Sequence, residues 1–262
     1  MDYKFFKKQN IELKTAKEIE KMRIAGRVVG EILQKLSGII EPGITTKDID
    51  VFSEKYIRSL KMTPAFLGVR GISYPFPASA CVSVNDEVVH GIPNASRLLK
   101  PGDIVSVDMG VIYEGYYGDA AMTYAVGSIS AVAEKLLEVT KLSLQKGIEQ
   151  VLSGKRLGDI SYAVQKTAED AGFSVVRDFV GHGIGRSLHE DPQIPNFGKA
   201  GTGIKLLPGM VLAIEPMINA GSYEVCIADD NWMVVTKDGS LSAHFEHTVA
   251  ITENGYEILT KV

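Results

Sequence analysis

The sequence predicts one α+β domain made of two related halves. Helical and strand-like segments follow one another in two rounds of helix, helix and strands, with no low-complexity linker between the rounds. Each round also carries an acid seven residues after the proline of a Pro-Gly pair: Asp108 after Pro101 and Glu215 after Pro208. We therefore expect a single domain over residues 1–262, with related halves at 1–127 and 128–262.

Four amphipathic helices are expected, two in each half. Thr15 and Glu18 form a capping box in front of the first, and Gly172 ends the fourth. Apolar residues recur at helical spacing in each of the four segments. The helices are expected from Thr15 to Ser37, from Thr45 to Leu60, over 133–152 and over 159–171.

Strands are expected between and after these helices. A loop rich in proline, glycine and aromatic residues at 64–77 precedes the first strand, and loops of this composition often line binding clefts. Asp238-Gly239 is a hairpin-turn sequence. Outside the hairpin considered next, the expected strands are 80–84, 175–180, 210–218, 224–227, 232–236 and 245–251.

Residues 101–119 predict a hairpin that carries two acids. We expect its turn at Tyr113, Glu114 and Gly115. With the centre between Tyr113 and Glu114, Asp108 and Asp119 lie directly opposite each other on one face, with Cβ atoms about 4.5–5.5 Å apart. Two carboxylates this close repel each other, so either one takes a proton or cations lie between them.

Two further matches support the internal repeat. Residues 46–49 match 157–160, and residues 89–92, around His90, match 181–184, around His182. The matches occur in the same order as the Pro-Gly pairs. A pseudo-twofold arrangement of the halves would bring Asp108 and Glu215 face to face in the middle of the domain.

Composition excludes several function classes. The chain has 262 residues, a net charge of −4 and no basic cluster beyond Lys7-Lys8, so we expect no nucleic-acid recognition. Two cysteines do not make a disulfide framework. Met1–Phe6 lacks the apolar core of a signal peptide, and no apolar run is long enough to span a bilayer. We expect a cytoplasmic protein without a membrane segment.

Acids and histidines in strand or tight-turn contexts are the candidates for chemistry. Four carboxylates with one or more imidazoles suit a pair of divalent ions better than a structural zinc site, and such a pair supports hydrolysis. No Gly-x-Ser-x-Gly or His-Glu-x-x-His pattern occurs, which removes the main support for a serine hydrolase or a zincin. The candidates are His90, Asp108, Asp119, His182, His189, Glu215 and Glu246.

These residues and their flanks resemble the ordered motifs of type I methionine aminopeptidases over about residues 12–260. The resemblance implies a pita-bread (creatinase/aminopeptidase-like) fold, with two pseudo-twofold-related halves around a curved antiparallel sheet and helices outside. The matching motifs are Val89-His90-Gly91-Ile92-Pro93, Asp108, Gly118-Asp119, Gly181-His182-Gly183-Ile184-Gly185-Arg186, His189-Glu190-Asp191-Pro192, Ile214-Glu215-Pro216-Met217 and Phe245-Glu246-His247-Thr248.

The resemblance also implies a role for each residue. Asp108 and Glu246 would be bridging or bidentate ligands of two metal ions, Asp119 would hold one ion, and His182 and Glu215 would hold the other. Glu215 would also be the general base, while His90 and His189 would bind the substrate and stabilise charge. The implied reaction is removal of the initiator methionine from nascent proteins with a small second residue, through a hydroxide bound to two metal ions.

Cofactor and partners follow from the same resemblance. The ions would be cobalt, manganese, iron or zinc, because this ligand set suits all four. The partners would be the N-terminal methionine of nascent chains and, transiently, the ribosome, and the protein would be a monomer. No long insertion separates His189 from Glu215 and no Cys/His-rich segment precedes the domain, as expected for type I rather than type II enzymes.

The resemblance places an apolar slot for methionine at Phe66, Cys81, Leu188 and Trp232. Sulfur and aromatic surfaces suit a thioether. Many relatives have phenylalanine where this chain has Leu188, and cysteine is common in bacterial relatives at the position of Phe66.

Three alternatives stay open at this level. The same fold also serves Xaa-Pro aminopeptidases and prolidases, which usually carry a large extra N-terminal domain. A second alternative is a catalytically silent module that binds a peptide or protein. In the third, the strand acids lie on a solvated face and the four slot residues belong to a plain core. Strand alternation also allows only one of Glu246 and His247 to face the site.

Overall fold

The computed structural model describes residues 10–262, so Met1–Phe6 and Lys7-Lys8 lie outside the described residues. All four predicted helices are confirmed, although the third ends four residues earlier than expected. Thr15 and Glu18 make the predicted capping box, and Thr45 and Asp48 make a second one. The helices are α1 (Ala16–Leu36), α2 (Thr46–Ser59), α3 (Ala131–Ile148) and α4 (Leu157–Asp170).

Within residues 10–262 the strands form four antiparallel sheets. One contains β1, β4, β5 and β2, and a second contains β15, β14, β9, β7 and β8; two small sheets contain β13, β10 and β6, and β11, β12 and β3. The strands are β1 (Thr63–Pro64), β2 (Ala80–Val84), β3 (Glu87–Val89), β4 (Ile104–Tyr113), β5 (Tyr116–Ala125), β6 (Ser174–Val175), β7 (Gly181–Gly183), β8 (Glu190–Ile194), β9 (Val211–Ile214), β10 (Met217–Asn219), β11 (Val225–Ile227), β12 (Val234–Thr236), β13 (Ser242–His244), β14 (His247–Thr252) and β15 (Gly255–Ile258).

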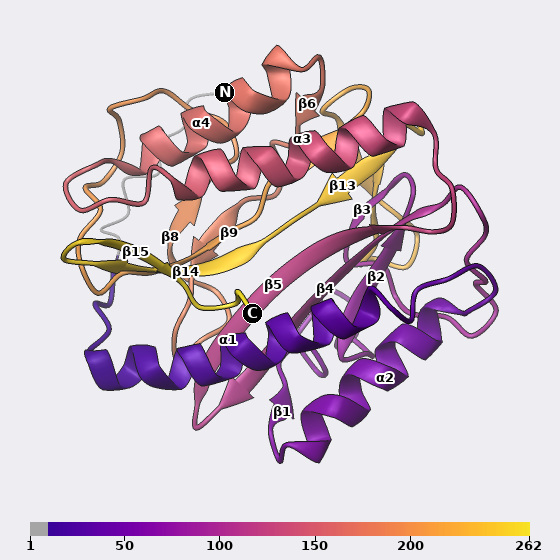
Figure 1. Cartoon of the computed structure of the whole chain (residues 1–262), viewed down its shortest axis with the longest axis horizontal. Helices are drawn as coiled ribbons and strands as arrows, with labels where there is room; N and C mark the ends of the chain where they lie inside the picture. Colours follow the sequence, from indigo (N-terminus) through magenta and orange to yellow (C-terminus); the bar gives the residue numbers. More distant parts are fainter. Residues whose placement is uncertain (1–9) are drawn as a thin grey trace.

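Helices cover the sheets in pairs. In Figure 1, α1 and α2 lie together along one side of the strands and α3 and α4 along the other. The first pair packs on β2, β4 and β5, and the second pair on strands of the C-terminal half. Gly26 in α1 and Gly118 in β5 allow a close approach, because a Cβ on Gly118 would lie 2.5 Å from the Gly26 backbone nitrogen. The α+β class with external helices is thus confirmed.

Strands β5 and β14 lie side by side and connect the two large sheets (Figure 1). The Thr248 hydroxyl accepts a hydrogen bond from the Asp119 amide at 3.0 Å and donates one to the Asp119 carbonyl at 2.7 Å. The Glu246 amide donates to the Ala121 carbonyl at 2.9 Å. These bonds fix Asp119 and Glu246, one from each half, next to each other.

The register of the 101–119 hairpin differs from the prediction. Its turn is the two-residue pair Glu114-Gly115, both with positive φ, and Tyr113 pairs with Tyr116. Asp108 therefore lies opposite Ala121, and Asp119 opposite Gly110. The two acids are diagonal neighbours rather than direct partners. They still share one face, because the shift is two residues and side chains alternate with a period of two.

Three other strand predictions were wrong in detail. The segment 175–180 pairs only at its start, in β6. The segment 210–218 is interrupted at Glu215-Pro216, and its two parts, β9 and β10, belong to different sheets. Asp238-Gly239 does form a turn, but β12 and β13 on either side of it also belong to different sheets, so it is not a hairpin.

Part of the internal repeat has a structural counterpart. Thr45 bridges to Leu98 just before α2, and Arg156 bridges to Lys205 just before α4. The match between His90 and His182 was wrong, because His90 follows β3, which pairs with β12, while His182 lies in β7, which pairs with β9. The division at residue 127 stays a prediction. Over residues 10–262, no helix has the length and apolar character needed to cross a membrane.

Candidate metal centre

Three of the five predicted metal ligands lie in strands and the other two lie next to strand ends, and they come from both parts of the sequence. Asp108 is in β4 and Asp119 in β5, whereas His182 is in β7. Glu215 directly follows β9, and Glu246 lies between β13 and β14. Asp108, His182 and Glu215 line one cavity of about 540 Å³, together with His90 and His189. The predicted meeting of Asp108 and Glu215 therefore has a counterpart in a shared cavity.

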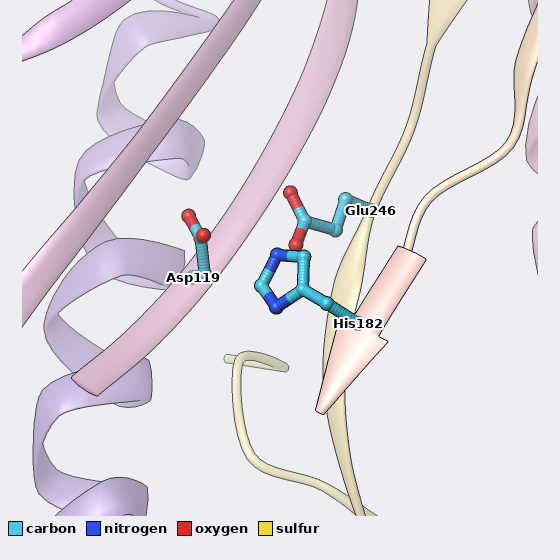
Figure 2. Close-up of side chains that lie close together, drawn as sticks. All are labelled: Asp119, His182 and Glu246. Atoms are coloured by element: carbon cyan, nitrogen blue, oxygen red, sulfur yellow. The ribbon is translucent and has the colours of Figure 1, made fainter. Parts of the chain in front are cut away.

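Asp119, His182 and Glu246 lie close together and form a group that could hold a metal ion (Figure 2). One potential ligand atom from each of the three lies within 4.8 Å of the others. All three side chains are buried. Their oxygen and nitrogen atoms offer the donors that divalent transition metals accept.

Local contacts orient His182 and Glu215. The Nδ1 atom of His182 lies 2.9 Å from the Gly183 carbonyl oxygen, which leaves Nε2 free to face Glu215 Oε1 at 3.5 Å. A histidine ligand is commonly fixed in this way, through a hydrogen bond from its other ring nitrogen. The Glu215 backbone carbonyl accepts a hydrogen bond from the Asn196 side-chain amide at 2.9 Å.

The buried carboxylates of the site lack hydrogen-bond partners. Among residues 10–262, no hydrogen-bond partner reaches Asp108 Oδ1, Asp119 Oδ1 or Glu246 Oε1. Burial raises the pKa of Asp108 to about 7. Burial, and then the charges of neighbouring acids, raise the pKa values of Asp119 and Glu246 well above their usual range.

The pKa of Glu215 is also raised well above its usual range, by burial and then by the charge of Asp108. Buried, mutually repelling carboxylates with unpaired oxygens are costly unless protonated or bound to cations. The residues present therefore fit divalent metal ions.

His90 and His189 lie at the same cavity but differ in exposure. His90 is half-buried, has a positive φ of 62°, and its ring contacts Phe179 at a centroid distance of 5.7 Å. Burial lowers its pKa to about 4, so the ring is neutral near pH 7. His189 is exposed, and its ring packs edge-on against His182 with centroids 4.5 Å apart.

The four residues predicted for the methionine slot share one apolar cluster. Phe66 and Cys81 are buried in it, and Leu188 and Trp232 pack against it. None of the four lines the 540 Å³ cavity, but Trp232 lines an adjoining cavity of about 420 Å³ that shares His90 and Phe179 with the first. Their proximity agrees with the predicted slot, while their contact with substrate stays a prediction.

The choice between Glu246 and His247 is resolved by the structure. Glu246 joins Asp119 and His182, whereas His247 turns away and its Nδ1 lies 2.8 Å from the Thr260 hydroxyl. This outcome agrees with strand alternation.

Two side chains of this site were not predicted from the sequence. Phe179 lines both cavities, and no local pattern marks it. His244 is buried, and its Nε2 lies 3.7 Å from Glu215 Oε2. Its position two residues before Glu246 in an extended segment was a usable signal, because alternate residues share a face.

Comparisons with known proteins agree with this geometry. Residues 20–253 match the profile of metallopeptidase family M24. A methionine aminopeptidase of Clostridium perfringens is 55% identical over 252 residues, covering 96% of this chain and 99% of the relative. The Clostridium acetobutylicum methionine aminopeptidase is 53% identical over 250 residues, covering 95% and 98%.

Solved structures give the same result. The crystal structure of the Thermotoga maritima methionine aminopeptidase has a TM-score of 0.93 and 50% identity, covering 96% of this chain and all of that one. The chain therefore belongs to metallopeptidase family M24, and its fold and enzyme class are those of a pita-bread metal-dependent aminopeptidase.

Proposed function

We propose that the chain removes the N-terminal methionine from nascent proteins whose second residue is small, and that it uses two divalent ions. The observation that carries the proposal is the convergence of five ligand-type side chains: Asp108, His182 and Glu215 line one cavity, and Asp119 and Glu246 group with His182. Three of the five have an unpartnered buried oxygen. The similarity to methionine aminopeptidases over nearly their whole length supports methionine as the side chain recognised.

In this proposal five residues hold the ions. Asp108 and Glu246 would hold both ions, Asp119 would hold one of them, and His182 and Glu215 would hold the other. When bound, the ions lower the pKa of a water molecule and polarise the peptide carbonyl. Manganese, cobalt, iron and zinc all suit this donor set.

The remaining chemistry belongs to the protein side chains. Glu215 accepts the proton of the attacking water and transfers it to the departing amine. His90 and His189 donate hydrogen bonds to the substrate at the carbonyl and at the scissile nitrogen, where charge develops. The balance is one water and one peptide bond consumed, and free methionine and a shortened chain released.

Substrate selection follows from the apolar surroundings. Phe66, Cys81, Leu188 and Trp232 would contact the methionine side chain, since sulfur and aromatic groups suit a thioether. The preference for a small second residue reflects narrowing of the cleft beyond this slot. We further propose a cytoplasmic monomer that contacts the ribosome transiently and recognises no nucleic acid.

Hydrolysis of two peptides tests the proposal. Metal-free protein is reconstituted with manganese, cobalt, iron or zinc, one ion at a time, and assayed on Met-Ala-Ser and on an Ala-Pro peptide. We expect release of methionine with at least one ion and little cleavage of the Ala-Pro peptide. Preferential Ala-Pro cleavage would instead indicate a prolidase-type substrate, and binding without any cleavage would indicate a silent module.

A further inference from the structure

Lys14, the residue before the N-cap of α1, is a buried charge. Only 1% of its side chain is exposed. Its Nζ atom donates to Glu190 Oε2 at 2.6 Å, and also to the Glu12 carboxylate at 3.3 Å and the Glu12 carbonyl at 3.2 Å. A buried ammonium group is costly unless it is paired and hydrogen-bonded, so Glu190 is the main reason that Lys14 tolerates this position.

The second carboxylate oxygen of Glu190 binds the backbone of the loop between β7 and β8. Glu190 Oε1 accepts hydrogen bonds from the amides of Arg186 at 2.7 Å and Ser187 at 3.0 Å. These residues belong to the segment 184–189 between β7 and β8, which starts two residues after His182 and ends with His189. One carboxylate therefore connects Lys14 to the loop that carries His189.

Other contacts join the same two segments. Arg186 Nη2 donates to Glu18 Oε1 at 3.1 Å, in the first turn of α1. A Cβ on Gly185 would lie 2.2 Å from Lys14 Cε, so the lysine stem packs directly on the loop backbone. The Lys14 amide also donates to the Gly209 carbonyl at 2.7 Å, which fixes the lysine itself to the turn before β9.

We propose that Lys14 is a positioning residue for His189. It neutralises and orients the Glu190 carboxylate, and the carboxylate holds the loop so that the His189 ring packs against His182. The inference rests on the proposed function, in which His189 touches the substrate. A small displacement of such a group is enough to lower turnover, because the reacting atoms require close alignment.

The Lys14→Met variant tests the ion pair between Lys14 and Glu190, because methionine keeps much of the apolar stem of lysine and removes its charge. It leaves a buried carboxylate without its cation, and we expect kcat to fall roughly tenfold or more with little change in bound metal. The double variant Lys14→Met/Glu190→Gln removes the uncompensated charge and keeps an oxygen for the two loop amides. It should recover a large part of the lost kcat.

Arg23, in the helix that follows Lys14, supplies a control. Its Nε donates to Glu257 Oε1 at 2.6 Å, a pair that joins α1 to β15 away from the cavity. Arg23→Met should lower thermal stability without changing kcat. If Lys14→Met does not fold, Glu190→Gln alone breaks the same ion pair from the loop side and should show the same loss.

A double-mutant cycle with His189→Ala separates positioning from general stability. If Lys14 acts through His189, Lys14→Met adds little to the loss caused by His189→Ala. Amide exchange of residues 184–190 should be faster in Lys14→Met than in wild type or Arg23→Met. Independent losses in the cycle, an unchanged kcat or unchanged exchange would overturn the inference. Wild-type protein that releases no methionine would refute the proposed function, while the exchange measurement would still decide the loop contact.

Discussion

His244 Nε2 lies 3.7 Å from Glu215 Oε2, although the two residues come from β13 and from the end of β9. Neither ring nitrogen of His244 has a hydrogen-bond partner within the described part of the chain. Burial lowers the pKa of His244 to about 3, so the ring is neutral. A neutral imidazole facing the proposed general base is placed to orient its carboxylate.

The first prediction follows from this contact. His244→Ala should lower kcat by about 10- to 100-fold, the range seen when a residue that supports a metal ligand is lost. His247→Ala is the control, because His247 lies three residues further along the chain and is partly buried but faces Thr260. Steady-state kinetics on Met-Ala-Ser with both variants makes the comparison. Equal losses in the two would show that the contact with Glu215 has no special role.

Glu215→Ala should abolish turnover. The variant removes both the proposed base and one proposed ligand, and loss of general base catalysis alone costs about 10²- to 10⁴-fold. Methionine release is measured with metal in excess, so that weaker metal binding does not limit the rate. Appreciable activity under those conditions would rule out Glu215 as the base.

His90→Asn should lower kcat about 100-fold and leave the metal content unchanged, because His90 is proposed to stabilise charge rather than to hold metal. Asparagine is the chosen replacement because it tolerates the positive φ of 62° at this position. Elemental analysis beside the kinetics gives the decisive comparison. Loss of metal in this variant would place His90 among the ligands instead.

Removing the metal should make stability depend on pH in a defined direction. The native pKa of Asp108 is raised to about 7 and those of Asp119, Glu215 and Glu246 are raised well above their usual range, so these groups bind more protons in the folded than in the unfolded state. Their contribution to stability is present at low pH and is lost as pH rises through the native pKa values.

Between pH 7.5 and 9 the lowered pKa values of the buried histidines have little effect, because a histidine with the ordinary pKa of about 6.5 is then largely neutral in the unfolded state as well. The free energy of unfolding of metal-free protein should therefore fall over this window, by about 1.4 kcal/mol per pH unit for each proton that the folded acids retain and the unfolded chain has released. Denaturant titrations at four pH values measure it, with manganese-loaded protein as the control. A constant or rising stability in the metal-free sample would contradict the raised native pKa values of the four acids.

The sequence predicted the helices well because their end signals are local. Thr15 and Glu18 lie three residues apart, and the cap they form needs no information from the rest of the chain. The hairpin register was missed because Tyr-Glu-Gly-Tyr allows more than one turn length. The break at Glu215-Pro216 was also missed, since the apolar run continues on both sides of it.

The candidate site was also predictable only in part, because contacts between residues far apart in the sequence leave no local signal. The ligand-type residues lie in motifs that resemble a known family, so their convergence could be expected. His244 carried a weak signal through its spacing from Glu246. Lys14 carried none, because its partner Glu190 lies 176 residues away in the sequence.

The central claim is that acids from both halves, with one imidazole, bind a pair of cations. Anomalous diffraction from manganese-soaked crystals, recorded above the metal absorption edge, tests it most directly. We predict two strong peaks between the side chains of Asp108, Asp119, His182, Glu215 and Glu246. Peaks confined to other parts of the molecule, or none in this cavity at saturating manganese, would contradict it.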